Sequence, residues 1–328
     1  MKNLSRPALL IPILLMLGLA ALPLVAVRLD DNFWVAFFAR VLVYGIAASA
    51  LNIALGFGGL VSLGHALFLG IGMYSVSLPA YYGITSGWLH LAVCAVACAL
   101  VGGLTGLISL RTSGIAFIMI TLAFAQMGYF VIVSLKQYGG DDGMSIAGSS
   151  SFAGVQLNTP TAVYYTAWVL LAALTYWVYR LRQSPFGMVL RGGRQNAKRV
   201  MSLGLPLRTY QLAAYVLSAV LCGVAGMLLA NLNAYASPSS MSWTVSGELI
   251  VMVVLGGMGS VFGPLLGATA FLGAEEVLKA FTEHWMALFG LAILAVAMAG
   301  RTGLAGWLDK LRLPAAKAAA ALPEEAAP

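Results

Sequence analysis

Residue types that perform catalysis or bind metals are few in this sequence, and their spacing matches no enzyme motif. The three histidines form no His-Glu-x-x-His pair of the kind that binds zinc in metalloproteases. The loop Gly-x-x-x-x-Gly-Lys-Ser/Thr, which holds the phosphates of ATP, is absent. The three cysteines lie inside apolar runs, which favours structural thiols over a disulfide or a metal site. The sequence therefore predicts no enzyme, no cofactor and no metal in this chain.

Composition excludes several further classes of protein. Only 9% of the 328 residues are charged and 61% are hydrophobic, whereas soluble proteins carry about 25% charged and 45–50% apolar residues. Lys and Arg number 18 against 11 Asp and Glu, a net charge of +7. A cytosolic enzyme, a disordered chain and a nucleic-acid binder do not fit these values. The sequence predicts an all-α polytopic membrane protein.

Apolar runs predict about ten membrane-spanning helices, because about 20 residues cross the hydrocarbon of a bilayer. The predicted spans are 8–27, 33–55, 60–81, 88–110, 115–135, 162–181, 210–232, 246–255, 265–281 and 285–299. The first run is preceded by Lys2 and Arg6, as a signal peptide would be, but its length favours an uncleaved helix. The run 246–255 is too short to cross about 30 Å of hydrocarbon.

Basic residues indicate the orientation of these spans. The loop between Arg180 and Arg208 holds seven Lys and Arg residues and no acidic residue. If this loop and both termini are cytoplasmic, fourteen basic residues lie inside and three outside. We therefore expect a transmembrane domain over 1–313, with a cytoplasmic loop at about 182–209 and an outer loop at about 136–161. The Ala-rich tail 314–328 is expected to be disordered.

Two glycine-rich stretches, 56–65 and 255–264, interrupt the apolar runs, one in each half of the chain. Irregular backbone at membrane depth is tolerated where it is buried in protein or lines a cavity. A transport path and close helix packing both explain such glycines. Candidate path residues, which we expect near these breaks or at polar positions within the spans, are Asn52, Gly58, Gly59, Ser62, His65, Gln126, Glu248, Gly256, Gly257 and Gly259. For His65, hydrogen-bonded packing is the alternative to a role in the path.

Charged residues inside the predicted spans are scarce. Arg40 is the only charge well inside a span, and Glu248 lies near an outer end. Arg40 either extends toward the membrane surface or faces the interior of the bundle. The scarcity argues against a stand-alone transporter driven by protons or sodium, which would need ionisable groups at mid-membrane.

The segment that begins at Ser184 predicts a short helix in the cytoplasmic loop. Ser184 is suited to cap the helix and Pro185 to begin it. The basic residues Arg191, Arg194 and Lys198 can share one face, whereas the predicted apolar face holds Phe186, Leu190, Ala197 and Met201. Gly192 and Gly193 should weaken the helix by about 1 kcal/mol each. A helix of this kind either lies on anionic lipid or docks a soluble partner.

The outer loop contains the run Gly139, Gly140, Asp141, Asp142 and Gly143. Its spacing is not that of a calcium-binding EF-hand. The loop is either simply solvated or meets an external partner.

Several stretches together resemble the LivM family, the permease subunits of bacterial ABC importers for branched-chain amino acids. The resemblance covers roughly 41–294, and its motifs are 51–52, 62–72, 121–126, 139–143, 184–196 and 246–267. It implies an inner-membrane subunit that works with a second related permease, two cytoplasmic ATPases that bind ATP and magnesium, and a periplasmic substrate-binding protein.

The resemblance also assigns roles to two loops. The cytoplasmic helix would couple to an ATPase through Ser184, Pro185, Phe186, Gly187, Leu190, Arg191, Arg194, Gln195 and Asn196. The Asp141-Asp142 loop would face the binding protein. Gln195 stands where the family usually has Glu, so any ion pair assumed there is in doubt. A permease for urea or short-chain amides is the nearest alternative, and a stand-alone secondary transporter is the alternative from another class.

Overall fold

The computed structural model describes residues 18–19, 32–152, 154–281, 284, 286–291, 294, 303–304 and 306. Most of the predicted first span 8–27, much of the predicted last span 285–299 and the whole tail 314–328 therefore lie outside the described residues. The expectations for those segments, and for both termini, stay predictions.

Helices make up most of the described chain. The long helices are α2 (Asn32–Asn52), α3 (His65–Tyr81), α4 (Gly87–Ser109), α5 (Ile115–Ser134), α6 (Pro160–Gln183), α9 (Leu207–Asn233), α10 (Trp243–Gly256) and α11 (Gly263–Phe281). The short helical elements are η1 (Ile53–Phe57), η2 (Lys136–Tyr138), α7 (Pro185–Gln195), α8 (Ala197–Ser202) and η3 (Pro238–Met241). The strands are β1 (Met144–Ser145), β2 (Ser151–Phe152), β3 (Val155–Gln156) and β4 (Tyr235–Ala236).

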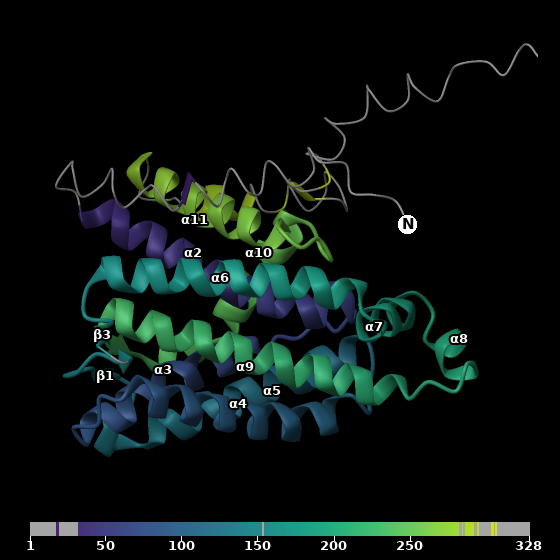
Figure 1. The fold of residues 1–328 in the computed structure, drawn as a ribbon, viewed down its shortest axis with the longest axis horizontal. Helices are drawn as coiled ribbons and strands as arrows, with labels where there is room; N and C mark the ends of the chain where they lie inside the picture. The colour runs from purple at the N-terminus through teal and green to yellow at the C-terminus, as the bar shows by residue number, and fades with distance from the viewer. Residues whose placement is uncertain are drawn as a thin grey trace, which may run out of the picture.

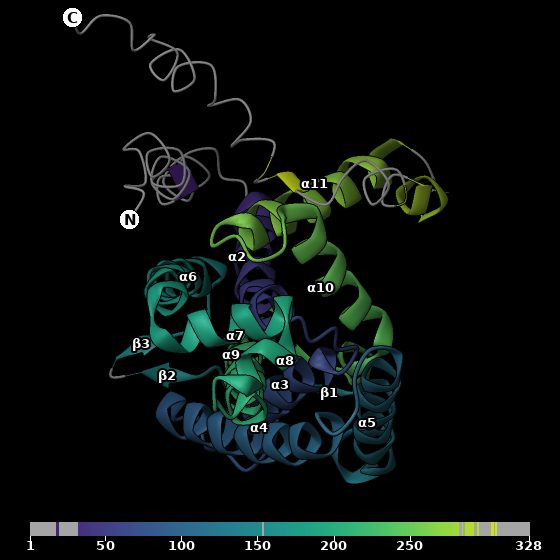
Figure 2. The same ribbon diagram turned by 90° about the vertical axis from the view of Figure 1, so that its right-hand side faces the viewer.

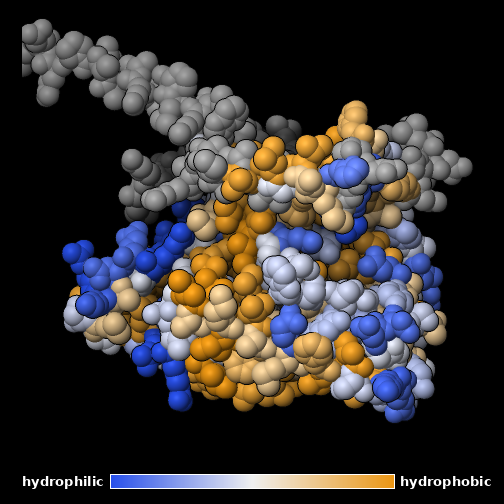
Figure 3. Space-filling model, turned by 180° about the vertical axis from the view of Figure 1, so that it is seen from behind, coloured by the Kyte–Doolittle hydropathy of each residue, from blue (hydrophilic) through white to orange (hydrophobic). Residues whose placement is uncertain are grey.

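The prediction of an all-helical membrane protein is confirmed at this level. Five described helical segments are long and apolar enough to cross a membrane, and α10 is a shorter apolar helix of 14 residues. The total of ten spans stays a prediction. Figure 3 shows hydrophobic residues over the middle of one face and hydrophilic residues gathered toward its two sides.

The two polar loops lie at opposite ends of the bundle (Figure 1). At one end, called here the α7 end, the chain forms α7 and α8. At the other, called the hairpin end, β1 pairs antiparallel with β4, and β2 pairs antiparallel with β3. These strands of two residues each are a small addition to the predicted all-α architecture.

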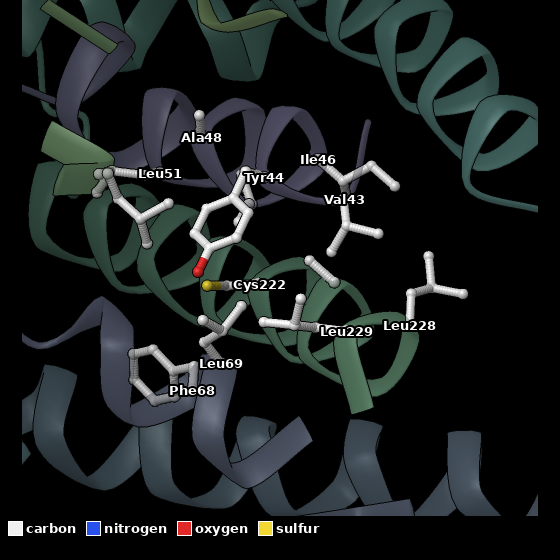
Figure 4. Packing of buried hydrophobic residues seen from close by; sticks show 14 of the residues in the cluster. Val43, Tyr44, Ile46, Ala48, Leu51, Phe68, Leu69, Cys222, Leu228 and Leu229 are labelled. Carbon is white, nitrogen blue, oxygen red and sulfur yellow. The ribbon is translucent and has the colours of Figure 1, made fainter. Parts of the chain in front are cut away.

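Helix α9 forms the centre of the bundle and packs against α2, α3 and α4 (Figure 2). Figure 4 shows side chains of one buried hydrophobic cluster that come from α2, α3 and α9, among them Ile46, Phe68 and Leu229. Helices α3 and α9 approach closely enough that a Cβ on Gly72 would overlap the carbonyl group of Gly223. Glycine-mediated contact of this kind is common between helices in membranes.

The first glycine-rich stretch is irregular over seven residues. Helix α2 continues into the π-helical turn η1 and ends at Phe57, and the next helix begins at His65. The predicted span 60–81 thus begins five residues too early. The reason is local bonding, because the Gly64 N–H donates to Ser62 Oγ and the Leu63 N–H to Thr121 Oγ1, outside any helical pattern.

Candidate functional site

The two glycine breaks, far apart in the sequence, meet at the α7 end. Asn52 is 1% exposed and binds the second break with both ends of its side-chain amide. Its Nδ2 donates to the Ser260 carbonyl over 2.8 Å, and its Oδ1 accepts from the Gly259 N–H over 2.9 Å. The Asn52 side chain therefore joins the end of α2 to the turn between α10 and α11. We call this region, formed by 56–59 and 256–260 around Asn52, the junction.

The junction requires glycine where the two backbones approach. A Cβ on Gly56 would lie 2.6 Å from the Gly259 nitrogen and would also overlap the Asn52 side chain. Gly257 and Gly259 have φ angles of 111° and 78°, which residues with a Cβ rarely adopt. At Gly56 the structure thus shows close packing of two backbones, while a role of these glycines in lining a path stays a prediction.

Helix α7 begins as the sequence predicts. The Ser184 Oγ accepts from the Gly187 N–H over 3.2 Å, and Pro185 occupies the first turn. Leu190 is buried, and the Phe186 ring lies 5.6 Å from that of Tyr210 on α9. These contacts dock one face of α7 on the chain itself.

One sequence expectation for this helix is wrong, because the apolar face does not continue to Ala197 and Met201, which are exposed on the separate helix α8. The break falls at Asn196, whose extended backbone ends α7 and whose Oδ1 caps α8 at the Arg199 N–H. The predicted weakening of the helix by Gly193 stays a prediction. A Cβ on Gly193 would overlap the Leu207 side chain, so the glycine lets α7 lie close to α9.

The two arginines on the predicted basic face of α7 bond to different parts of the chain. The Arg191 Nη2 donates to the Arg182 carbonyl over 2.8 Å and its Nε to the Gly187 carbonyl over 3.2 Å, which ties α7 to the end of α6. Burial, and then the neighbouring Arg182, lower the pKa of Arg191 from its ordinary value. The Arg194 Nη1 instead donates to the Gly56 carbonyl, so this side chain joins α7 to the junction. Gln195 and Lys198 are exposed.

The remaining path candidates lie outside this contact. His65 is buried and donates from Nε2 to Ser218 Oγ over 2.8 Å, because the Ser218 hydroxyl itself donates to the Ala50 carbonyl. Ser62, three residues earlier, is also buried, and its Oγ accepts from the Gly64 N–H. Gln126 on α5 is half-buried, and so is Glu248 on α10. Glu248 precedes Gly256 by eight residues, about 12 Å along a helix.

Arg40 is exposed on α2, and its guanidinium carbon lies 5.7 Å from the centre of the Tyr44 ring. A cation over an aromatic face is a favourable placement. The sequence left two alternatives for Arg40, the membrane surface and the interior of the bundle. Within the described residues the Arg40 side chain is exposed and does not lie in the interior.

At the hairpin end, the predicted partner-facing loop presents two exposed carboxylates. Gly139, Gly140 and Gly143 all have positive φ angles, which lets the chain turn tightly around Asp141 and Asp142. Tyr129 donates to Asp141 Oδ1 over 3.2 Å, and the Tyr235 hydroxyl donates to the Asp142 carbonyl.

Tyrosines extend this surface. The hydroxyls of Tyr82 and Tyr138 lie 2.6 Å apart, and this hydrogen bond, with a smaller contribution from burial, raises the pKa of Tyr138. Within the described residues no group of three or more His, Cys, Asp and Glu side chains could hold a metal ion.

Sequence reasoning named both breaks and the helix of 184–196, but it did not predict that they touch. The contacts join residues 138, 207 and 208 positions apart. The one usable signal was Asn52, a polar residue one helical turn before a glycine-rich break.

Known relatives align with most of the length of this chain. The LivM permease protein of the high-affinity branched-chain amino acid transport system of Escherichia coli K12 is 28% identical over 273 residues, 76% of this chain and 64% of that protein. LivH of the same organism is 24% identical over 284 residues, 80% of this chain and 91% of that protein. A probable LivM of Methanocaldococcus jannaschii is 23% identical over 316 residues, 80% of this chain and 90% of that protein.

The chain covers 64% of the length of the E. coli LivM protein, which is less than two thirds. No solved structure matches it. The sequence profile of the family described as "Branched-chain amino acid transport system / permease component" matches residues 33–297, most of the chain. Together with the apolar helices, this match shows that the chain is a multi-pass membrane protein and belongs to the branched-chain amino acid transport permease family.

Proposed function

We propose that this chain is a permease subunit of an ABC importer in a bacterial inner membrane, and that it forms part of the path for branched-chain amino acids. Family membership supports the class of transporter and its substrate. The observation that carries the proposal for this particular chain is the hydrogen bond from Arg194 on α7 to the first glycine break, where Asn52 in turn bonds to the second break. A helix outside the spans is thereby bonded to irregular backbone of the kind that lines transport paths.

The proposed assembly contains a second related permease, two cytoplasmic ATPases and a periplasmic substrate-binding protein. In this arrangement the chain has ten spans with both termini cytoplasmic, the α7 end faces the ATPases and the hairpin end faces the binding protein. ATP and magnesium bind to the ATPases, and this chain performs no covalent chemistry. Closure of the ATPases displaces α7, and the bundle changes between two discrete packings.

The ATPase-facing surface proposed here differs from the apolar face predicted from sequence. Leu190 is buried against the bundle, whereas Met188 on α7, Met201 on α8 and Leu203 directly after α8 are exposed. Exposed Lys198 and Arg199 lie on α8 as well. Exposed apolar residues beside basic ones suit a partner groove with an apolar floor and an acidic rim.

The class of transporter is tested by affinity purification of this chain, expressed with its genomic neighbours, followed by mass spectrometry. We expect two ATPases and a second permease in the purified complex, and ATP-dependent leucine uptake in proteoliposomes supplied with the binding protein. Uptake of urea or an amide in place of leucine would contradict the substrate. A chain that purifies alone and transports under an ion gradient would contradict the importer.

The docking surface is tested by Leu203→Asp, which places a charge on the exposed apolar surface of the α7 end. We expect the ATPases to be lost from the purified complex. The matched control is Ser113→Asp, in the exposed turn between α4 and α5 at the same end. Equal retention of the ATPases by both variants would show that the docking surface lies elsewhere.

A further inference from the structure

The Gly56 carbonyl is an orphan acceptor at the end of a helix. The N–H groups that follow it donate to earlier carbonyls: Gly58 to Ile53, Gly59 to Leu55 and Leu60 to Ala54. Carbonyls at a helix C-terminus lack partners within the helix and carry a partial negative charge. The guanidinium of Arg194 supplies both the missing donor and a complementary positive charge.

Arg194 also lies against both breaks through its stem and head. A Cβ added to Gly59 would lie 2.9 Å from Arg194 Cγ, so the stem covers the first break. A Cβ added to Gly259 would lie 3.6 Å from Arg194 Nη1, so the head group adjoins the second. One side chain of α7 therefore contacts the place where α2 and the α10–α11 turn meet.

Asn52 continues this connection. It precedes Gly56 by four residues, one turn of helix, and bonds to the backbone of Gly259 and Ser260. The same short piece of α2 and η1 is thus held by α7 from one side and by the second break from the other.

We infer that Arg194 and Asn52 are positioning residues that transmit the displacement of α7 to both glycine breaks at once. This inference rests on the proposed function, because it specifies how ATP hydrolysis in the partners reaches the path. The Arg194 guanidinium then bonds within its own chain, whereas Lys198 and Arg199 remain for the ATPases.

The test uses the complete complex in proteoliposomes and measures leucine uptake and ATP hydrolysis in the same preparation. For Arg194→Gln we expect uptake per ATP hydrolysed to fall about tenfold, while the ATPases stay bound and hydrolysis stays within about twofold, because the lost bond lies inside this chain. Arg194→Lys keeps the charge and one donor, and we expect it to restore part of the uptake. The matched control is Arg111→Gln, at an exposed position of the same end, with unchanged uptake.

A double variant, Arg194→Gln with Asn52→Ala, distinguishes a linked pair from two independent structural residues. If the two act in series, the double variant loses no more coupling than the worse single variant. Losses that multiply would overturn the linkage.

Other outcomes are equally decisive. Wild-type uptake per ATP in Arg194→Gln would overturn the inference, and so would a parallel loss of uptake, hydrolysis and bound ATPases, which would make Arg194 a docking residue. If Arg194→Gln does not insert into the membrane, Arg194→Lys and Asn52→Ala are tested as separate single variants. Full uptake per ATP by both would overturn the inference. Failure of the proposed function is distinct, because the wild-type complex itself would then show no ATP-driven uptake.

Discussion

Two buried asparagines hold distant segments together, one at each end of the bundle, and their surroundings differ. At the hairpin end, the Asn231 Oδ1 accepts from the Ser150 N–H over 2.8 Å, and its Nδ2 donates to Ser150 Oγ over 3.0 Å. At the α7 end, Asn52 makes the corresponding pair of bonds to the backbone of the second break. A buried side-chain amide therefore joins segments that are distant in the sequence at each end of the bundle.

The difference lies in what surrounds each amide. Around Asn231 the network includes further side chains, since His90 Nδ1 bonds to Ser150 Oγ over 2.8 Å and its Nε2 donates to the Ile84 carbonyl over 3.0 Å. Around Asn52 the partners are glycine-rich backbone, with Gly59 and Met258 exposed beside it. The hairpin end is therefore a closure made largely by side chains, and the α7 end is a joint made of glycine-rich backbone, through which α7 and the two breaks are held together.

The largest expected effect comes from filling the joint with a side chain. Gly256→Ala places a Cβ onto the Gly263 carbonyl group, and such overpacking costs about 1–3 kcal/mol or more. We expect uptake to fall about tenfold or more, measured per complex in proteoliposomes. Gly247→Ala on the same helix is the control, because nothing lies within 4 Å of its Cβ. Equal losses in both variants would contradict the tight junction.

The next effect compares the two asparagines directly. Asn52→Leu and Asn231→Leu each leave buried polar groups unpaired, at about 1–3 kcal/mol per group, so both should lower the melting temperature. We expect Asn231→Leu to reduce the amount of assembled protein but not uptake per complex, whereas Asn52→Leu reduces uptake per complex. Size-exclusion chromatography after heating, together with uptake assays, measures both. Equal changes in uptake per complex for the two variants would contradict the distinction between closure and joint.

The smallest effect separates backbone strain from contact. Gly59 and Gly83 have φ angles of 71° and 77°, so alanine at either position costs about 1–2 kcal/mol of backbone strain. Only Gly59→Ala also displaces Arg194, since nothing lies within 4 Å of a Cβ on Gly83. We expect uptake per complex to fall about threefold for Gly59→Ala and to stay within about 1.5-fold for Gly83→Ala. A similar fall in both variants would mean that strain alone acts.

The sequence predicted the helices well and the contacts between them poorly. Apolar runs and the Ser184-Pro185 start of α7 are local signals, and the structure confirms both. Helices in a membrane are apolar on both their lipid-facing and their packed faces, so periodicity does not reveal which faces meet.

The same limit explains what spacing missed at α7. From spacing alone, Gly193 weakens a helix and Arg194 extends a basic face. In the structure, Gly193 also lies against the Leu207 side chain, and the Gly56 carbonyl binds Arg194. Both partners lie in other helical segments, beyond the reach of a pattern read within one helix.

The central claim is that α7 and the two breaks move as one unit during the transport cycle. Spin labels at Gln195→Cys on α7 and Met258→Cys in the second break, both exposed sites, report one distance, and Gln195→Cys with Ile115→Cys at the exposed start of α5 reports another. The native cysteines are buried and do not compete for label. The distances are compared between the nucleotide-free and ATP-trapped complexes, in labelled preparations that retain uptake. The account predicts an unchanged distance from 195 to 258 and a changed distance from 195 to 115. A changed distance from 195 to 258, with that from 195 to 115 constant, would contradict it.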